Sequence, residues 1–236
     1  MKISIIIPVR NEELLIEKII GELEIKLKDL PYEIIFINDF SSDNTVQVAE
    51  KIIQNKLQIN LYNNTKKGLG GAITKGIDKS TGEVVCIMMS DLSDNIDDLK
   101  KYYQIIKNES VDAVFGSRFI SGSKIIDYPK KKLILNRVFN IITKLLFISD
   151  YNDFTNAFKI YRKEALLKTF PLVSESFNIF LELPLKIISR KMKYKIIPIS
   201  WINRKEGASK FDIKELRAKY LFTLIYCFLE KLLLKK

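Results

Sequence analysis

The first half of the chain alternates short continuous apolar runs with stretches in which apolar residues recur at the period of a helix. Continuous runs indicate buried strands, and the helical period indicates helices that pack one face on a core. The pattern predicts strands at 3–7, 33–37, 57–61, 84–88 and 113–115, and helices at 12–28, 46–53, 72–79 and 96–107. This alternation is typical of an α/β fold with a mostly parallel central sheet flanked by helices.

The second half has a different pattern, with longer helices and fewer strands. It predicts an amphipathic basic helix at 133–148, a helix at 177–189, a strand at 195–199 and a long apolar helix at 213–234. No repeat or flexible linker separates the halves, and 236 residues suit one domain with a substantial core. We expect a single domain at 1–212, with halves at 1–123 and 124–212, followed by a C-terminal amphipathic helix at 213–236.

Charge is divided unevenly between these halves. Residues 1–123 hold 15 Lys and Arg against 18 Asp and Glu, a balance of −3, whereas residues 124–236 hold 24 against 10, a balance of +14. The basic half is suited to meet phosphates, either of a lipid, of a nucleic acid or of an anionic membrane. The alternative is a lysine-rich surface that only contacts water.

Several classes of chemistry and location are excluded by composition. The chain has no histidine, so it has no Ser-His-Asp triad, no Cys-His pair and no His-ligated zinc. Any bound divalent ion must therefore use oxygen ligands. The apolar run at 3–7 is too short for a signal peptide and fits a first strand. The two distant cysteines, Cys86 and Cys227, indicate no disulfide framework, and a reducing cytoplasm is the expected setting.

In a parallel sheet, ligands bind at the carboxyl ends of the strands, and polar motifs follow the predicted strands here. In order they are Pro8-Val9-Arg10-Asn11-Glu12, Asn38-Asp39 with Ser41-Ser42-Asp43-Asn44-Thr45, Lys67-Gly68-Leu69-Gly70, Asp91-Leu92-Ser93, Gly116-Ser117-Arg118, Asp153-Phe154-Thr155 with Phe158-Lys159, and Arg204 with Ser209-Lys210. The set resembles glycosyltransferase family 2, in its dolichol-phosphate mannose synthase and polyprenyl-phosphate glycosyltransferase branch, over nearly the whole chain.

The resemblance implies a GT-A, Rossmann-like fold and an inverting transfer of a hexose from a UDP- or GDP-sugar to a polyprenyl (dolichyl or undecaprenyl) phosphate. Residues 1–123 would bind the nucleotide sugar, and residues 124–212 would form the acceptor side. The implied donor-binding residues are Pro8, Arg10, Glu12, Ile37, Asp39, Lys67, Gly68, Ser90, Asp91, Arg204 and Lys210. Carboxylates such as Glu12 and Asp39 accept hydrogen bonds from base N–H groups or sugar hydroxyls. Each of these residues also has a structural alternative to donor binding. Glu12 would then be an acidic residue that favours the start of a helix, and the glycines would only allow a tight turn.

The resemblance also assigns catalytic roles to Asp91, Asp153 and Arg118, and acceptor-phosphate binding to Arg118 and Arg137. Guanidinium groups pair bidentately with phosphate and stabilise the departing nucleoside diphosphate. A phosphate acceptor is already ionised, so we expect Asp153 to orient groups rather than to remove a proton. For Arg137, a position on a solvated helix face is the alternative.

The segment after the fourth strand bears on the metal. GT-A enzymes usually carry Asp-x-Asp there, with Mg²⁺ or Mn²⁺ shared between the carboxylates and the donor diphosphate, and the matching residues are Met89, Ser90 and Asp91. Methionine is a poor ligand for a hard cation. Asp91 and Ser93 are the expected ligands, in a weakened site. For Asp94 we expect a helix cap.

The last helix is apolar around much of its circumference, and lysines flank it. It is too short in apolar residues to span a bilayer and suits the interface, although packing on the domain or forming a homo-oligomer are alternatives. We expect a protein peripheral on the inner, cytoplasmic face of a membrane, with a nucleotide-sugar donor and a polyprenyl-phosphate acceptor as partners. Alternatives are a glycan or glycolipid acceptor, or a catalytically silent nucleotide-sugar-binding protein. Nucleic acid is not expected, since the chain has no recognisable nucleic-acid-binding module.

Overall fold

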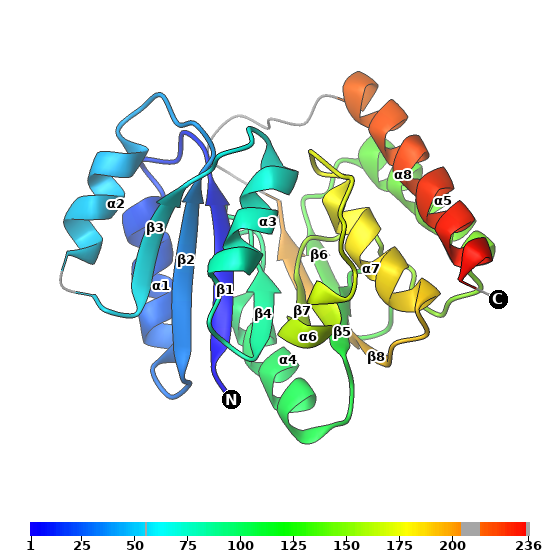
Figure 1. Ribbon diagram of the computed structural model, residues 1–236, viewed down its shortest axis with the longest axis horizontal. Coiled ribbons are helices and arrows are strands. Elements are labelled where there is room, and N and C mark those ends of the chain that lie inside the picture. Colours follow the sequence, from blue (N-terminus) through cyan, green and yellow to red (C-terminus); the bar gives the residue numbers. More distant parts are fainter. Residues whose placement is uncertain (55, 204–212, 235–236) are drawn as a thin grey trace.

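A seven-stranded sheet organises the protein in the computed structural model, which describes residues 1–54, 56–203 and 213–234 (Figure 1). The strand order is β3-β2-β1-β4-β7-β5-β8, and every neighbouring pair is parallel except those that β7 makes. The strands are β1 (Ile3–Val9), β2 (Tyr32–Asn38), β3 (Ile59–Asn63), β4 (Val84–Ile87), β5 (Ala113–Ser117), β7 (Lys159–Arg162) and β8 (Tyr194–Pro198). The expected α/β fold with a mostly parallel sheet is confirmed.

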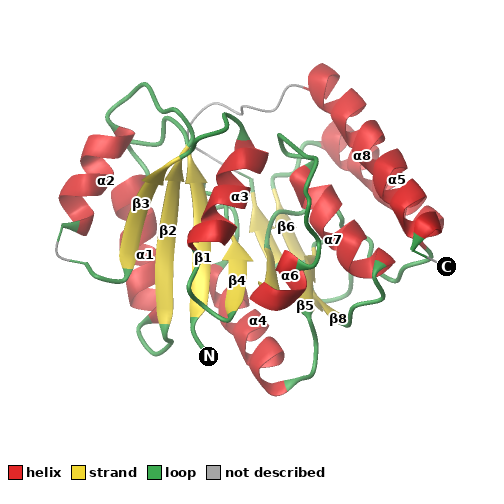
Figure 2. Ribbon diagram, viewed as in Figure 1, coloured by secondary structure: helices red, strands yellow, loops and turns green. Residues whose placement is uncertain are grey.

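Helices cover both faces of this sheet, as Figure 2 shows. The side chains of β1 alternate between two cores: Ile5 faces the layer of α1, α2 and α4, and Ile6 faces the layer of α3, α6 and α7. The helices are α1 (Ile16–Leu27), α2 (Thr45–Ile53), α3 (Leu69–Lys79), α4 (Ile96–Asn108), α5 (Lys130–Phe147), α6 (Lys163–Leu167), α7 (Ile179–Ser189) and α8 (Ile213–Leu233). Burial on both faces explains why the strands are continuous apolar runs.

Some boundaries differ from the sequence predictions. The strand expected at 57–61 is β3 at 59–63, since Leu57 is fully exposed before the strand begins. The helix expected from residue 12 begins at Ile16, because residues 12–15 form a turn in which the Glu12 carbonyl accepts the amides of Leu15 and Ile16. The helix expected from residue 72 begins at Leu69.

Four elements escaped the sequence prediction. These are the short helix α6, the strand β7, and the strands β6 (Lys124–Ile126) and β9 (Ser200–Ile202), which form a separate two-stranded sheet. Strand β7 is antiparallel to both β4 and β5. Its first residue therefore lies at the edge where β4 and β5 end, so the chain leading into β7 reaches the same end of the sheet as the loops after the parallel strands.

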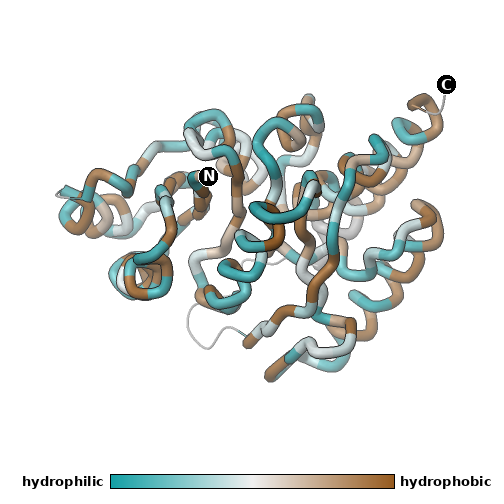
Figure 3. The backbone as a smooth tube through the Cα atoms, turned by 90° about the horizontal axis from the view of Figure 1, so that it is seen from below, coloured by the Kyte–Doolittle hydropathy of each residue, from teal (hydrophilic) through white to brown (hydrophobic). Residues whose placement is uncertain are grey.

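Helix α8 packs along α7 and also contacts α5 (Figure 1). Its inner side buries Leu224 and Cys227, whereas Phe222 and Leu229 on the outer side are more than half exposed. Apolar positions recur along the helix that leads to the C-terminus in Figure 3. The helix thus packs on the domain along one side, as one of the sequence alternatives expected, and leaves an apolar surface open on the other.

Candidate active site

The loops after β1 and β2 are tied to each other by polar contacts. Asn11 donates its amide N–H to Ser41 Oγ at 3.0 Å, and its side-chain Oδ1 accepts the Ser42 amide at 2.8 Å. The Glu12 amide donates to Thr45 Oγ1 at 2.8 Å, and the Glu12 side chain is buried. The two predicted donor-binding segments therefore form one connected edge. Pro8 and Ile37 are buried in their strands beneath this edge, and Arg10 is exposed.

Asp39 joins this edge to the glycine-containing loop. It is 6% exposed, and its Oδ1 accepts hydrogen bonds from the Asn64 side chain and from the Gly68 amide, both at 2.8 Å. A buried carboxylate oxygen with two N–H donors is held in one orientation. Lys67 is exposed next to this contact. The structure therefore brings Asp39, Lys67 and Gly68 together, as the sequence predicted, and it adds Asn64 as the side chain that holds Asp39.

The glycines of this loop approach a distant segment closely. Gly68 has φ +116°, a backbone conformation that favours glycine. A Cβ on Gly70 would lie 1.9 Å from the Ser174 carbonyl oxygen, and the Gly70 amide donates to the Glu175 carbonyl at 3.1 Å. The amides of Gly68 and Gly70 are therefore already bonded to protein acceptors. These glycines are required by contact with residues 174–175 as well as by the turn.

The segment after β4 places its carboxylates in different surroundings. Asp91 is partly buried, and its Oδ1 accepts the Ser93 amide at 3.1 Å; Ser90 and Ser93 are buried beside it. The expectation that Asp94 caps the next helix is wrong. Asn95 is the cap of α4, and its side-chain oxygen accepts the Asp97 amide at 2.9 Å. Asp94 lies before the cap, where its backbone forms an isolated antiparallel β-bridge with Trp201.

Asp94 instead faces the interior below the site. Burial raises the pKa of its carboxyl to about 7, and the negative charge of Asp91 adds to this, against the opposing charges of Arg118 and Lys159. Burial in β4 raises the pKa of Cys86, and the charge of Asp94 adds to this. The carboxyl therefore belongs to an internal charge cluster below Asp91.

Arg118 and Asp153 form a buried ion pair at the end of β5. Arg118 Nε donates to Asp153 Oδ2 at 2.8 Å and Nη2 donates to Oδ1 at 2.7 Å, and the Arg118 amide also donates to Oδ2 at 2.9 Å. Asp153 is fully buried. Burial would lower the pKa of Arg118, but the charge of Asp153 raises it above its usual value. Two predicted catalytic residues therefore hold each other, and both Asp153 oxygens accept from Arg118.

Aromatic rings surround the Arg118 guanidinium. Its Cζ lies 5.4 Å from the ring centre of Phe119, 5.6 Å from that of Tyr128 and 5.7 Å from that of Trp201. Arg137, on α5, also lies over the Phe119 ring, with its Cζ 4.3 Å from the ring centre. Cation–π contacts of this kind orient a guanidinium without consuming its N–H donors.

Helix α5 brings a cation to the site that the sequence reading did not single out. Burial lowers the pKa of Lys132, the charge of Arg118 lowers it further, and the charge of Asp91 opposes this. Lys132 therefore lies within the electrostatic reach of both predicted site residues. Its position in a run of three lysines concealed it, because Lys130–Lys132 are alike in sequence and only the packing of α5 distinguishes them.

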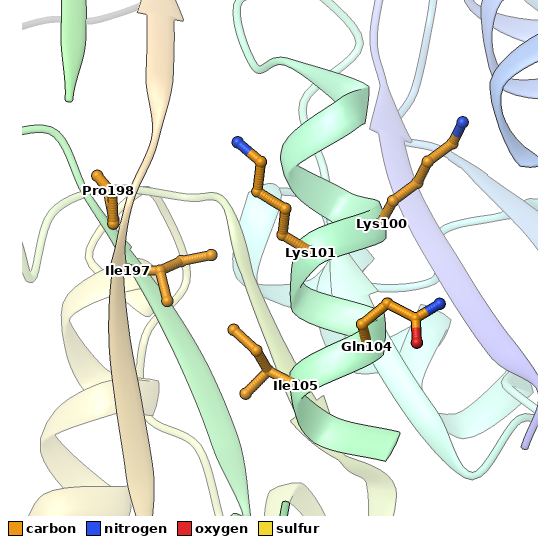
Figure 4. A pocket seen from close by; sticks show the side chains of 6 residues that line it. All are labelled: Lys100, Lys101, Gln104, Ile105, Ile197 and Pro198. Carbon is orange, nitrogen blue, oxygen red and sulfur yellow. The ribbon is translucent and has the colours of Figure 1, made fainter. Parts of the chain in front are cut away.

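Two predicted donor-binding residues, Arg204 and Lys210, lie outside the described residues. A hollow of about 540 Å³ lies elsewhere, between α4 and β8, where Lys101 and Ile105 face Ile197 and Pro198 (Figure 4). None of its lining residues belongs to the site described above. Its walls are mainly aliphatic, so it offers little to hold a charged diphosphate.

Known proteins resemble this chain in sequence. A model of the family described as glycosyl transferase family 2 matches residues 4–170. The chain belongs to this family. It is 29% identical over 217 residues to a dolichol-phosphate mannosyltransferase of Pyrococcus furiosus, covering 91% of this chain and 60% of that protein. It is 24% identical over 220 residues to a polyprenol monophosphomannose synthase of Mycolicibacterium smegmatis, covering 90% and 82%.

The chain spans only part of the length of the curated relatives that it matches. It spans 60% of the Pyrococcus protein and 35% of the glycosyltransferase AglD of Haloferax volcanii, to which it is 23% identical over 90% of its own length. Among solved structures, glucosyl-3-phosphoglycerate synthase of Mycobacterium tuberculosis, in complex with Mn²⁺, UDP-glucose and phosphoglyceric acid, matches with a TM-score of 0.74. That match covers 96% of this chain and 79% of the other at 16% identity, and it shows that the fold is shared.

Proposed function

We propose that this family 2 protein transfers a hexose from a UDP- or GDP-sugar to a polyprenyl phosphate at a membrane surface. Two of its relatives are named for transfer of mannose to a dolichol or polyprenol phosphate. The division of charge supports the same reading, because the basic character belongs to residues 124–236, which carry +14, being 24 Lys and Arg against 10 Asp and Glu. The donor would bind along the edge formed by Glu12, Asp39 and the glycine loop.

One observation carries the proposal: helix α5 joins cations at the site to an exposed apolar face. Lys132 and Arg137 lie near Asp91, Arg118 and Phe119. The same helix exposes large apolar side chains along its length, and these are Ile134, Leu135, Val138, Ile141, Ile142, Leu145 and Leu146. A polyprenyl phosphate combines an anionic headgroup with a long apolar chain, and one helix here offers a partner for each.

Helix α8 enlarges this apolar surface. It contacts α5 and exposes Leu221, Phe222, Ile225, Leu229, Leu232 and Leu233. Exposed apolar areas on two adjacent helices, with lysines at their ends, are typical of helices that lie in a membrane interface. No helix within the described residues is both long and apolar enough to cross a membrane. We further propose that the exposed faces of α5 and α8 meet the inner, cytoplasmic face of that membrane.

The geometry of Asp153 supports a phosphate acceptor over a sugar hydroxyl. A hydroxyl acceptor needs a general base, whereas a phosphate oxygen is already ionised. Both oxygens of Asp153 accept hydrogen bonds from Arg118, and the side chain is fully buried. Asp153 is thus suited to orient Arg118. In the proposed step, the acceptor phosphate oxygen forms a bond to the anomeric carbon as the bond to the donor diphosphate breaks, with inversion. The bonding electrons leave with the nucleoside diphosphate.

A divalent ion would have one carboxylate ligand from this segment. Among the described residues, no three His, Cys, Asp or Glu side chains gather closely enough to hold a metal ion. Mg²⁺ accepts one or two carboxylates when substrate phosphates supply other ligands. Asp91 with Ser93 therefore fits an ion shared with the donor diphosphate, and the ion would neutralise charge on the leaving group.

The test is a transfer assay with purified protein, UDP- and GDP-hexoses and a short-chain polyprenyl phosphate, with and without Mn²⁺. We expect product from one nucleotide class, and Lys132→Gln should raise the KM for the polyprenyl phosphate about tenfold while that for the donor changes little. Lys130→Gln is the matched control on the same turn of α5. Transfer only to a glycan would overturn the acceptor. Donor binding by calorimetry without transfer to either acceptor would favour a catalytically silent protein.

A further inference from the structure

Glu182 is a buried carboxylate on α7 whose partners belong to a loop rather than to a substrate. It is fully buried, and its Oε1 accepts the Val173 amide at 2.9 Å while its Oε2 accepts the Ser174 amide at 2.8 Å. Lys186, one turn later, places its Nζ 2.9 Å from Oε1 and also donates to the Pro171 carbonyl. A buried charge with three N–H donors is strongly oriented, so Glu182 holds residues 173–174 in one position.

That loop is the one that contacts the glycines of the candidate donor site. The Gly70 amide donates to the Glu175 carbonyl at 3.1 Å, and a Cβ on Gly68 would lie 2.5 Å from the same oxygen. On its other side, the glycine loop is held by Asp39, which accepts the Gly68 amide. The glycine loop therefore lies between Asp39, a predicted donor-binding residue, and residues 174–175, next to the amides that Glu182 holds.

Helix α7 also contacts the predicted acceptor side, through Phe180, which lies two residues before Glu182. Pro184 lies inside α7 and has no N–H, so the carbonyl of Phe180 lacks its usual helical partner. That carbonyl accepts from Lys159 Nζ at 3.5 Å, and Lys159 also donates to the carbonyls of Phe154 at 3.2 Å and of Asn156. Lys159 is buried and holds the residues that follow Asp153, the partner of Arg118.

We propose that α7 positions both substrate loops: Glu182 acts on the donor loop at 66–71, and the Phe180 carbonyl of α7 contacts Lys159 of β7, which holds the acceptor loop at 153–156. Both are positioning residues, since each acts through backbone groups of a loop. The inference rests on the proposed function for its kinetic consequences, but the structural link does not depend on it.

The two residues provide matched variants for the experiment. Glu182→Gln keeps the size of the side chain but replaces one acceptor oxygen by a donor, and Lys159→Met removes all three contacts to carbonyls. Amide hydrogen exchange is measured first, on the protein without ligands. We expect Glu182→Gln to raise exchange about tenfold at residues 66–71 with little change at 153–156, and Lys159→Met to do the reverse, because each variant weakens the hydrogen bonds that hold only one of the two loops.

Steady-state kinetics give the second readout. Glu182→Gln should raise the KM for the nucleotide sugar about tenfold and leave the KM for the acceptor within about twofold, and Lys159→Met should show the opposite pattern. Glu182→Asp retains the charge beside Lys186 but is too short to reach both amides, so it should reproduce the donor effect even if Glu182→Gln folds poorly. Equal changes at both loops, or in both KM values, would overturn the proposal. If the native protein transfers no sugar, the proposed function fails, and hydrogen exchange still decides whether α7 positions the loops.

Discussion

Residues 1–123 and 124–236 hold their polar groups in different ways. In the first part, carboxylates are fixed mainly by neutral donors: Asp39 by the Asn64 side chain and the Gly68 amide, and Glu33 by Ser4 and Thr81 together with the Lys2 ammonium. In the second part, the buried carboxylates Asp153 and Glu182 are each paired with a cation, Arg118 and Lys186 respectively, and two helices leave apolar faces open. The first arrangement suits a rigid edge for a polar donor, and the second suits an anionic, lipid-like acceptor. The difference teaches that one α/β fold carries two surfaces of unlike chemistry.

The largest effect is expected at the boundary between these parts. Asp153→Ala removes the partner of Arg118, which is itself 8% exposed and then retains an unpaired charge in the interior. Breaking a buried ion pair in this way costs about 3–5 kcal/mol of unfolding free energy. Urea denaturation would measure it. The double variant Arg118→Met/Asp153→Leu should recover much of the loss, and a double variant as unstable as the single would show that packing, not charge, holds the two parts together.

Asp91→Asn tests the proposed catalytic role of a residue in the first part, because it should change the rate of transfer and not the stability of the protein. Asparagine retains an oxygen for the Ser93 amide, so the free energy of unfolding should change little. If Asp91 holds an ion at the donor diphosphate, as we propose, loss of its carboxylate should lower kcat by about 10²-fold or more. Stability and rate are measured on the same preparation. A variant that retains most of its transfer rate would move the metal and diphosphate site away from Asp91.

Glu33 makes the stability of the first part depend on pH. It lies near the start of β2, away from the candidate site, which lies beyond the end of that strand. Burial alone would raise its pKa, but hydrogen bonds from Ser4, Thr81 and Lys2 lower it from 4.5 to about 2. Its contribution to stability is therefore complete above pH 4.5 and is lost as pH falls through about 2. Glu33→Gln should lose roughly 2 kcal/mol at neutral pH and show a flatter stability curve between these limits. Equal slopes in both proteins would contradict this, and kcat should not change.

The apolar face of the second part predicts a moderate change in membrane binding. Leu145 and Leu229 are exposed on α5 and α8, and Leu14 is exposed in the first part. The double variant Leu145→Ser/Leu229→Ser should bind vesicles containing anionic lipid roughly tenfold more weakly, because less apolar area is buried. Co-sedimentation measures the change, and Leu14→Ser is the control that should leave it unaltered. Equal losses in both variants would remove the distinction between the two surfaces.

The smallest effect is expected from restoring a carboxylate. Met89→Asp places a second carboxylate near Asp91 at the end of β4 and should tighten Mn²⁺ binding in the presence of a nucleoside diphosphate by about threefold to tenfold. Calorimetry measures this, with Met88→Leu, a fully buried neighbour, as the control. Unchanged affinity would place the ion away from residue 89.

Much of the first part could be predicted because its signals are local. Continuous apolar runs such as Ile3–Val9 predict buried strands whatever the partner, and parallel strands bring their following loops to one edge. Asp39, Gly68 and Asp91 therefore fall where the sequence put them. The strand β7 was missed because it is four residues long and carries Lys159 and Arg162 at its ends, a pattern that has no strand period.

By itself, the sequence determined the α/β class, the order of the main strands and helices, and the family motifs at the strand ends, because each depends on residues near one another in the chain. Only the tertiary structure decided which groups meet across it. It paired Arg118 with Asp153, turned Asp94 inward and brought Lys132 within electrostatic reach of Arg118 and Asp91. It also packed residues 174–175, next to the Glu182 contacts, against the distant glycine loop. It also decided which faces of α5 and α8 stay open, since an amphipathic pattern marks an apolar face but not whether protein covers it.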